Sequence, residues 1–177
     1  LVLYRGLAQN SNNGDLRGWL DSTYFPAQSQ WGAEEVFYGL YGVAADLQPA
    51  RTASWTNIAL ARAATATTIR PGGILPVALT WRLQAPALRN YKVFVHVTKL
   101  DGFALGQHDA SPLNDLRPFT TLPIDTDVAD HHGVVIPPDA SGELRVLVGL
   151  YDPDTGERLL TSDGQDVVEI ARVIVAP

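Results

Sequence analysis

After residue 54, apolar and polar residues alternate along most of the chain, and this period of two predicts β-strands. One face of the stretch 74–83, "ILPVALTWRL", would carry Leu75, Val77, Leu79, Trp81 and Leu83. The stretch 91–99, "YKVFVHVTK", places valines on one face and Phe94 and His96 on the other. Two later stretches, 143–152 and 165–175, are apolar on both faces, as in central strands of a packed sheet.

Turn signals separate these strands. They are "RPGG" at 70–73, "LDG" at 100–102, "PPDASG" at 137–142 and "DPDTGE" at 152–157. The last is interpreted as a hairpin turn, with Arg158 close enough to pair with Asp152 or Asp154. We therefore predict a mainly β protein with about eight strands from Trp55 to Val175. They would form an antiparallel β-sandwich of immunoglobulin-like or jelly-roll type.

The first 48 residues have a different pattern of apolar and polar positions. "LVLYRGL" favours a strand, and a polar loop leads to Asp15, a candidate cap for a helix over 16–25. Leu16, Trp19 and Leu20 fall on one side of that helix, and the stretch 34–43, "EEVFYGLYGV", favours a second strand. We predict two domains. Residues 1–48 would be the strand–helix–strand remnant of a preceding α/β domain, and residues 49–177 the β-sandwich.

The amino-acid composition argues against several classes of function. The net charge is −6 and only 13 Lys and Arg residues are scattered along the chain, which argues against a nucleic-acid partner. No segment approaches the roughly 20 apolar residues of a membrane-spanning helix. The chain has no cysteine, which excludes disulfides and thiolate chemistry. Because neither an initiator methionine nor a signal peptide precedes Leu1, we expect a piece of a longer polypeptide.

His96 lies in the middle of a run of valines, and no HxH or HExxH spacing surrounds it. A catalytic histidine needs a nucleophile or carboxylate within hydrogen-bond reach, and a metal-binding histidine needs further ligands. The pattern favours a half-buried structural histidine that is hydrogen-bonded to a neighbouring strand.

The stretch 125–132, "DTDVADHH", is the densest acidic cluster. Asp125, Asp127 and Asp130 are candidate ligands for a calcium ion, although the complete calcium-loop pattern is absent. In an extended segment Asp125 and Asp127 share a face, while Asp130 points to the opposite one. The alternative is a solvated edge strand whose charges discourage association between sheets. We predict no cofactor, with calcium at these carboxylates as the alternative.

Aromatic residues are the remaining candidates for ligand binding, because the C–H faces of sugars stack on exposed rings. Candidate rings lie at or near predicted strand ends, although each could instead be a packing residue, whereas Trp81 is expected in the core. No GxSxG elbow occurs, and the spacing of carboxylates identifies no glycosidase pair, so we predict no catalytic residue. The candidate ligand-binding residues are Trp31, Trp55, Phe103, Phe119 and Tyr151.

The order of features from Pro71 to Leu159 resembles a known family. The stretch "RPGGILPVALTW", the strand "YKVFVHV", the "DG" turn, "DASP" and finally "GLYDPDTGERL" occur in sequence. This order resembles the C-terminal extracytoplasmic β-sandwich of bacterial multi-pass membrane glycosyltransferases. These are the polyprenyl-phosphate-sugar-dependent enzymes related to protein mannosyltransferases. The opening 48 residues are similar to the end of the α/β portion that precedes this sandwich. One departure is the stretch 122–132, which retains only Asp130 of the family's pattern there.

The resemblance implies that catalysis lies upstream, outside this chain, and that this region is a non-catalytic accessory domain on the extracytoplasmic side. It would bind or orient glycan acceptors, with a glycan or polysaccharide and the remainder of the parent membrane protein as partners. The isolated fragment is expected to be a soluble monomer. The alternatives are a free-standing carbohydrate-binding or adhesion module and, third, a small hydrolase.

Overall fold

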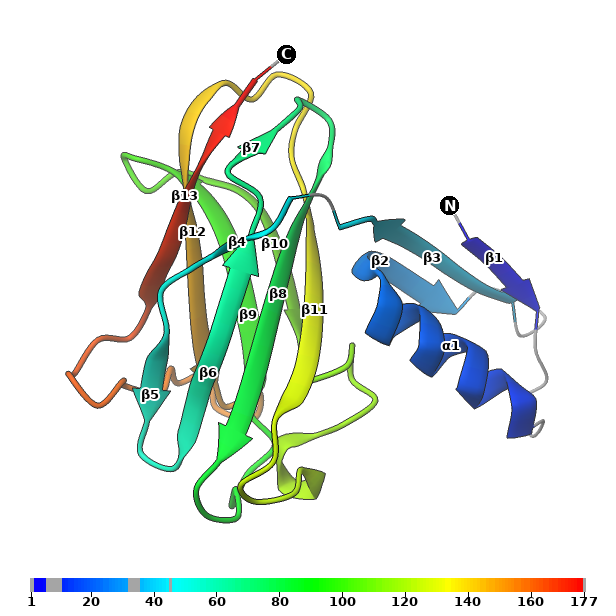
Figure 1. The fold of residues 1–177 in the computed structure, drawn as a ribbon, viewed down its shortest axis with the longest axis vertical. Coiled ribbons are helices and arrows are strands. Elements are labelled where there is room, and N and C mark those ends of the chain that lie inside the picture. Colours follow the sequence, from blue (N-terminus) through cyan, green and yellow to red (C-terminus); the bar gives the residue numbers. More distant parts are fainter. Residues whose placement is uncertain (1, 6–10, 32–35, 45, 177) are drawn as a thin grey trace.

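The computed structural model describes residues 2–5, 11–31, 36–44 and 46–176. It is mainly β, as the alternation predicts, and antiparallel sheets pack together as a β-sandwich (Figure 1). A smaller group of elements, which we call the N-terminal unit, lies beside the sandwich. Its elements are β1 (Val2–Arg5), α1 (Ser11–Thr23), β2 (Phe25–Trp31) and β3 (Val36–Gly42).

One layer of the sandwich, here called the β8 sheet, has the strand order β11-β8-β6-β4, with β5 paired to β6. Strand β8 lies at its centre, and every residue of the predicted apolar face is at most 1% exposed. The alternation in 74–83 is thus confirmed. The strands are β4 (Gln48–Pro49), β5 (Ala53–Trp55), β6 (Ile58–Thr65), β8 (Ile74–Leu83) and β11 (Val128–Val135).

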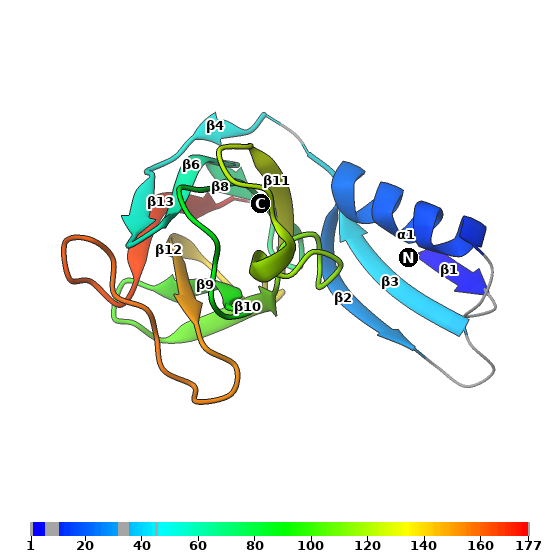
Figure 2. The same ribbon diagram turned by 90° about the horizontal axis from the view of Figure 1, so that it is seen from below.

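The second layer, here called the β9 sheet, has the order β10-β9-β12-β13-β7. Its inward side chains are valines and leucines of β9 and β12 with no exposed surface, and they meet the inward face of the β8 sheet. Figure 2, which looks along the sandwich, shows the two layers enclosing this core. The strands are β7 (Thr68–Ile69), β9 (Lys92–Lys99), β10 (Ala104–Ala110), β12 (Gly142–Tyr151) and β13 (Val168–Val175).

The N-terminal unit differs from its prediction in two respects. The helix begins at Ser11, so Asp15 lies inside it rather than at its start, and it is followed by β2, a strand that was not predicted. Of the three residues that the helical spacing places on one side, only Leu20 is buried, at 5% exposure, while Trp19 is 53% exposed. Trp19 instead packs edge-on against Tyr24, with ring centroids 5.7 Å apart.

The N-terminal unit packs against β11, the edge strand of the β8 sheet, mainly through β2 (Figure 2). The ring of Phe25 stacks on His131 with centroids 4.6 Å apart, and the Phe25 side chain is 2% exposed. Gly133 permits this close approach, because a Cβ there would lie 2.6 Å from the carbonyl oxygen of Phe25. Whether residues 1–48 and 49–177 fold as separate domains stays a prediction.

The helix α1 is too short and too polar to cross a membrane, and the same holds for every other helical segment among the described residues.

Gly149 of β12 lies where the fold leaves no room for a side chain, and a substitution can test this. It pairs with Phe94, whose ring covers it, so a Cβ at position 149 would lie 2.2 Å from the ring Cζ. We expect Gly149→Ala to lower the free energy of unfolding by about 1–3 kcal/mol, because the buried ring has to move. Urea denaturation measures this.

Gly18→Ala is the matched control. In α1 the added methyl group would meet only Leu116 Cδ1, at 3.9 Å. Since alanine is the better helix former, this variant should gain about 0.5–1 kcal/mol. A Gly149→Ala protein as stable as the wild type would contradict the packing described here.

Candidate functional site

A concave polar groove lies where the edge of β13 meets the segment that enters β5. Its volume is about 630 Å³. The backbone N–H of Arg51 donates to Ile170 O at 2.9 Å, and that of Ser162 donates to Ser54 O at 2.8 Å, so both sheets build its walls. We call it the edge groove. Its principal polar residues are Arg51, Ser54, Arg145, Asp163, Gln165 and Glu169.

Charges in the edge groove are paired. Arg145 Nε donates to Glu169 Oε2 at 2.6 Å, and Arg172 Nε donates to the other oxygen, Oε1, at 2.8 Å. The bond from Arg172, helped by Arg145, holds the pKa of Glu169 below its ordinary value. The Thr161 hydroxyl does the same to the pKa of Asp163. Both carboxylates are therefore ionised at neutral pH and can accept hydrogen bonds.

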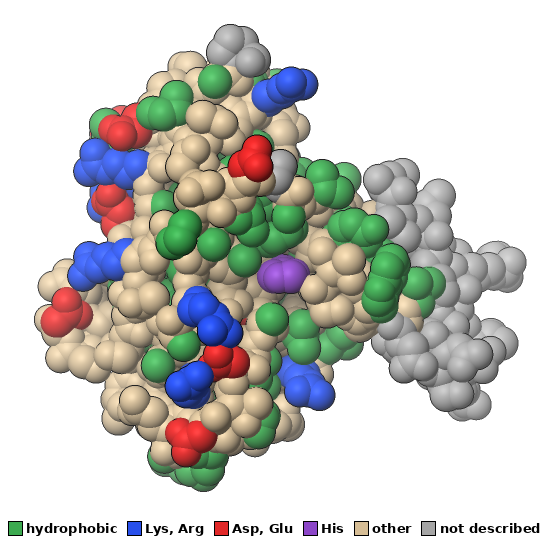
Figure 3. All heavy atoms as spheres, viewed as in Figure 1, with side chains coloured by type: hydrophobic (Ala, Val, Ile, Leu, Met, Phe, Trp, Pro, Cys, Tyr) green, Lys and Arg blue, Asp and Glu red, His purple; other side chains and the backbone are tan. Residues whose placement is uncertain are grey.

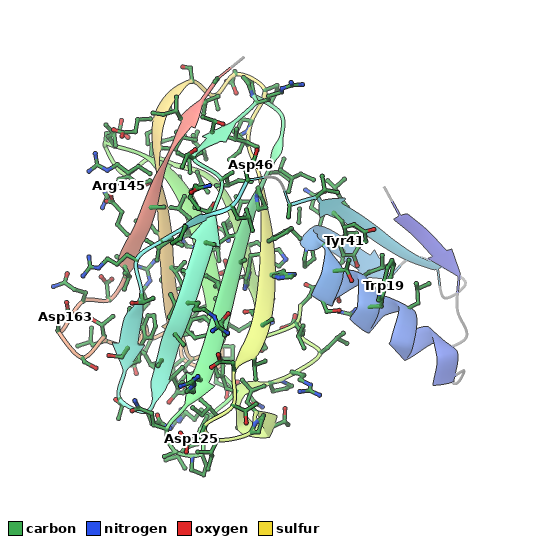
Figure 4. All side chains as sticks on the ribbon, viewed as in Figure 1. Trp19, Tyr41, Asp46, Asp125, Arg145 and Asp163 are labelled. Carbon is green, nitrogen blue, oxygen red and sulfur yellow. The ribbon has the colours of Figure 1, made fainter. Side chains whose placement is uncertain are left out.

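Figure 4 shows Arg145 and Asp163 projecting from the side of the sandwich opposite to the N-terminal unit. The side chains of both Arg51 and Asp163 are more than half exposed, and their closest charged atoms are 4.0 Å apart. The edge groove thus presents guanidinium, carboxylate, amide and hydroxyl groups to the solvent. This arrangement can bind a polar ligand through several directional hydrogen bonds.

Two of the five predicted ligand-binding rings are in the core, and those predictions are wrong. Trp55 is 1% exposed and lies beside Trp81, with centroids 5.8 Å apart. Phe119 has no exposed surface and meets Trp81 edge-on at 5.5 Å. Neither ring can reach a ligand, because both are enclosed in the core beside Trp81. Trp81 is in the core, as expected.

The two other candidate rings that the structure describes, Phe103 and Tyr151, do not form one platform. Phe103 is 63% exposed at the turn after β9, where Lys99 Nζ lies 5.6 Å from the ring centroid. Tyr151 lies at the opposite end of β9, where it pairs with Lys92. Trp31 ends β2, and its side chain lies outside the described residues.

Tyr151 belongs to a cluster on the outer face of the β9 sheet. Its ring lies 6.4 Å from that of Phe94, over which the Arg158 guanidinium is placed at 4.6 Å. Burial raises the pKa of Tyr151, and the nearby carboxylate of Asp109 adds to the effect. Arg158 pairs with Asp166 at 3.1 Å rather than with Asp152 or Asp154, whereas the hairpin turn at 152–157 is as predicted.

His96 occupies the same face and is half-buried, as predicted. Its Nε2 lies 3.3 Å from Asp109 Oδ1 on the neighbouring strand β10, but the angles are not those of a hydrogen bond. The ring packs against Phe94 with centroids 4.8 Å apart. His96 is therefore a strand residue with an electrostatic neighbour, and the hydrogen bond expected from the sequence is not formed.

The predicted calcium ligands do not converge. Asp125 is exposed at the end of the molecule (Figure 4), and Asp127 is held between Arg62 and Arg82, each at 2.6 Å. Figure 3 shows such basic and acidic side chains next to one another on this face. Asp130 points into the core with no exposed surface. Among the described residues no three His, Asp or Glu side chains are placed to hold a metal ion, so the calcium prediction is wrong.

Asp130 is instead the centre of a buried polar network that the sequence did not reveal. Its Oδ2 accepts from Trp81 Nε1 and His132 Nε2, both at 2.9 Å, and its Oδ1 accepts from the Leu113 N–H at 2.9 Å. Burial alone would raise the pKa of Asp130, but His132, Trp81 and Leu113 together hold it below its ordinary value. The carboxylate is therefore ionised inside the core.

The network crosses from one sheet to the other. His132 Nδ1 on β11 lies 2.8 Å from His108 Nδ1 on β10, so one of these two nitrogens carries a hydrogen atom. Burial, with a smaller contribution from His132, lowers the pKa of His108 to about 3. Asp130 and His132 have no exposed surface, so this arrangement joins the two layers inside the protein.

Comparison with known proteins identifies no family, because no family model matches the chain and no curated protein gives a significant match.

Asp130→Asn tests the network. An amide of the same size places an N–H₂ group against some of the three donors, so buried groups lose their partners. We expect a loss of about 3 kcal/mol in the free energy of unfolding. Asp127→Asn is the matched control at the surface and should cost less than about 1 kcal/mol. Equal losses in urea denaturation would contradict the assignment.

The pH dependence of stability follows from His108. The unfolded chain binds a proton near the ordinary histidine pKa of 6.5, while the folded protein does so only at about 3. The free energy of unfolding should therefore fall as the pH is lowered below 6.5, by up to about 1.4 kcal/mol per pH unit. Burial of His131 acts in the same direction.

Urea denaturation of wild type and His108→Gln at pH 7 and pH 5 measures this contribution. Between pH 7 and pH 5 the carboxylates with lowered pKa values, such as Asp115 and Asp130, stay ionised and do not contribute to the decline. The raised pKa of buried Asp21 works in the opposite direction, but equally in both proteins. The decline should be shallower in the variant, and equally steep declines would show that His108 does not contribute.

Proposed function

We propose that this chain is a non-catalytic, glycan-binding accessory module of a membrane glycosyltransferase, positioned on the extracytoplasmic side. Its task would be to bind or orient a glycan acceptor for a catalytic region elsewhere in the parent protein. The observation that supports this proposal most is the edge groove, because its lining matches the chemistry of a polyhydroxylated ligand.

A sugar hydroxyl both donates and accepts hydrogen bonds, so a glycan site needs both kinds of partner. In the edge groove Arg51 and Arg145 donate, Asp163 and Glu169 accept, and Gln165 can do both. The formal charges of these residues sum to zero, which favours a neutral glycan over a polyanion. Recognition would rest on hydrogen bonds rather than on ring stacking, since the groove is lined by polar and small aliphatic side chains.

We assign a non-catalytic role because the acidic and imidazole side chains that could serve in catalysis are engaged in structural contacts. Asp130 and His132 are sealed in the core, where they bind one another and Trp81. Asp127 is neutralised by two arginines. These contacts give Asp127, Asp130 and His132 structural roles. We propose that catalysis takes place in the remainder of the parent protein.

The parent assignment is supported by the resemblance of residues 71–159. The stretches that carry it include β8 and β9, each an interior strand of its sheet, and the end of β12 with the turn that follows. A free-standing carbohydrate-binding module would use the same groove. The two functions are distinguished by whether several membrane-spanning segments are encoded with this chain.

Gln165→Ala and Gln107→Ala form a matched pair for the binding test. Gln165 lines the edge groove, while Gln107 is exposed on β10, away from it. On an array of neutral and acidic glycans, followed by calorimetry with the best neutral ligand, Gln165→Ala should weaken binding about tenfold. This corresponds to one lost hydrogen bond of about 1.4 kcal/mol. Gln107→Ala should bind as the wild type does.

Two further variants separate the groove from the rings. Phe103→Ala and Tyr151→Ala remove the aromatic candidates outside the groove and should leave the affinity unchanged. Binding that depends on either ring and survives Gln165→Ala would overturn the groove assignment. If no glycan on the array binds, the module has a supporting role alone and the glycan-binding proposal fails.

A further inference from the structure

The turn between β10 and β11 has an unusual backbone. Leu113, Asn114 and Asp115 have φ angles of 56°, 53° and 70°, so three consecutive non-glycine residues are in the left-handed region. Residues with a side chain visit this region rarely and usually singly. Such a conformation persists only where its surroundings hold it in place. We call residues 111–117 the left-handed turn.

Contacts from the sandwich hold one side of this turn. The N–H of Leu113 donates to Asp130 Oδ1 at 2.9 Å, which makes the turn part of the buried network. Asp115 Oδ1 accepts from Lys92 Nζ on β9 at 2.8 Å and from the N–H of Ser111 at 2.7 Å. The position of Leu113 and the geometry of the Asp130–His132–His108 chain therefore depend on each other.

Contacts from the N-terminal unit hold the other side. Asn114 Nδ2 donates to Asp21 Oδ1 at 3.2 Å, and Arg17 Nη2 donates to the carbonyl oxygen of Asn114 at 2.7 Å. Asp21 also accepts from the Tyr41 hydroxyl at 2.9 Å. Both Asp21 and Asn114 are buried, with 0% and 4% of their surface exposed. The turn is thus hydrogen-bonded to α1 as well as to the sandwich.

We propose that the left-handed turn is a mechanical tie that couples docking of the N-terminal unit to the imidazole pair of His108 and His132. Adjacent residues bind the two carboxylates that have no exposed surface, since Leu113 binds Asp130 and Asn114 binds Asp21. A change in the backbone at either residue moves the other. Release of Asp21 relaxes the turn, withdraws a donor from Asp130 and alters the contact between the two histidines, and the coupling acts equally in reverse.

A second contact could carry the same coupling and has to be separated from the tie. Phe25 of the N-terminal unit stacks on His131, which is adjacent to His132 in the chain. This stack touches β11 directly and does not pass through residues 111–117.

The test is nitrogen-15 NMR of the full chain, with two readouts inside the sandwich: the ring signals of His108 and His132, and the hydrogen-exchange rate of the Leu113 amide. Asp21→Asn keeps the shape of the side chain but weakens its acceptor side. We expect the ring signals to shift and the Leu113 amide to exchange at least tenfold faster. Ser22→Ala is the control on the same helix, because its hydroxyl bonds only to Trp19 O, and both readouts should be unchanged.

If Asp21→Asn detaches or unfolds the N-terminal unit, Tyr41→Phe removes a single donor from Asp21 and should move both readouts in the same direction by less. Phe25→Leu perturbs the stack on His131 alone. It should leave exchange at Leu113 within threefold of the wild type. Unchanged readouts in both Asp21→Asn and Tyr41→Phe would overturn the tie, and so would faster exchange at Leu113 in Phe25→Leu than in Asp21→Asn.

Asn114→Gly completes the design. Glycine adopts the left-handed conformation without strain, but it lacks the amide that binds Asp21. In this background the ring shifts caused by Asp21→Asn should be at least halved, because the side-chain link is already gone. Shifts reduced by less than half would show that the coupling runs by another route.

Discussion

The structure depends on one buried charge, the carboxylate of Asp130. An ionised group without exposed surface is strongly destabilising unless hydrogen-bond donors replace the water it loses. Here three donors from three parts of the chain do so: the Trp81 indole from β8, the His132 imidazole from β11 and the Leu113 N–H from the left-handed turn. Their directions fix how β11 lies against β8, and His132 carries the connection to His108 in the opposite sheet.

The two sheets are held together by this polar network and by the packing of apolar side chains. Valines and leucines at alternate positions of β8, β9 and β12 fill the space between the sheets, which gives stability without direction. The polar network adds direction at one edge, where β10 and β11 close the sandwich. The opposite edge, where β5 approaches β13, remains open enough to form the edge groove.

Local alternation was enough to predict the sandwich, the position of β8 and β9, and the burial of Trp81. Burial at strand ends was not predictable in this way, because Trp55 and Phe119 pack against Trp81, which is distant from both in sequence. Strand β2 was missed, since Pro26 and the polar residues after it resemble a loop. Alternation correctly placed Asp130 on the face opposite to Asp127, but its partner Trp81 depends on the register between β8 and β11. The edge groove likewise combines residues from three distant segments, none of which carries a motif.

The central claim is that Asp130 is ionised inside the folded core, and it can be measured directly. The carbon-13 chemical shift of the Asp130 carboxyl group, followed from pH 7 downward in the folded protein, reports its protonation. We expect a carboxylate shift at neutral pH and a titration midpoint below the ordinary aspartate pKa of 3.8, because its three donors hold the pKa of Asp130 below that value. A carboxylic-acid shift at neutral pH, or a titration midpoint above 3.8, would contradict it.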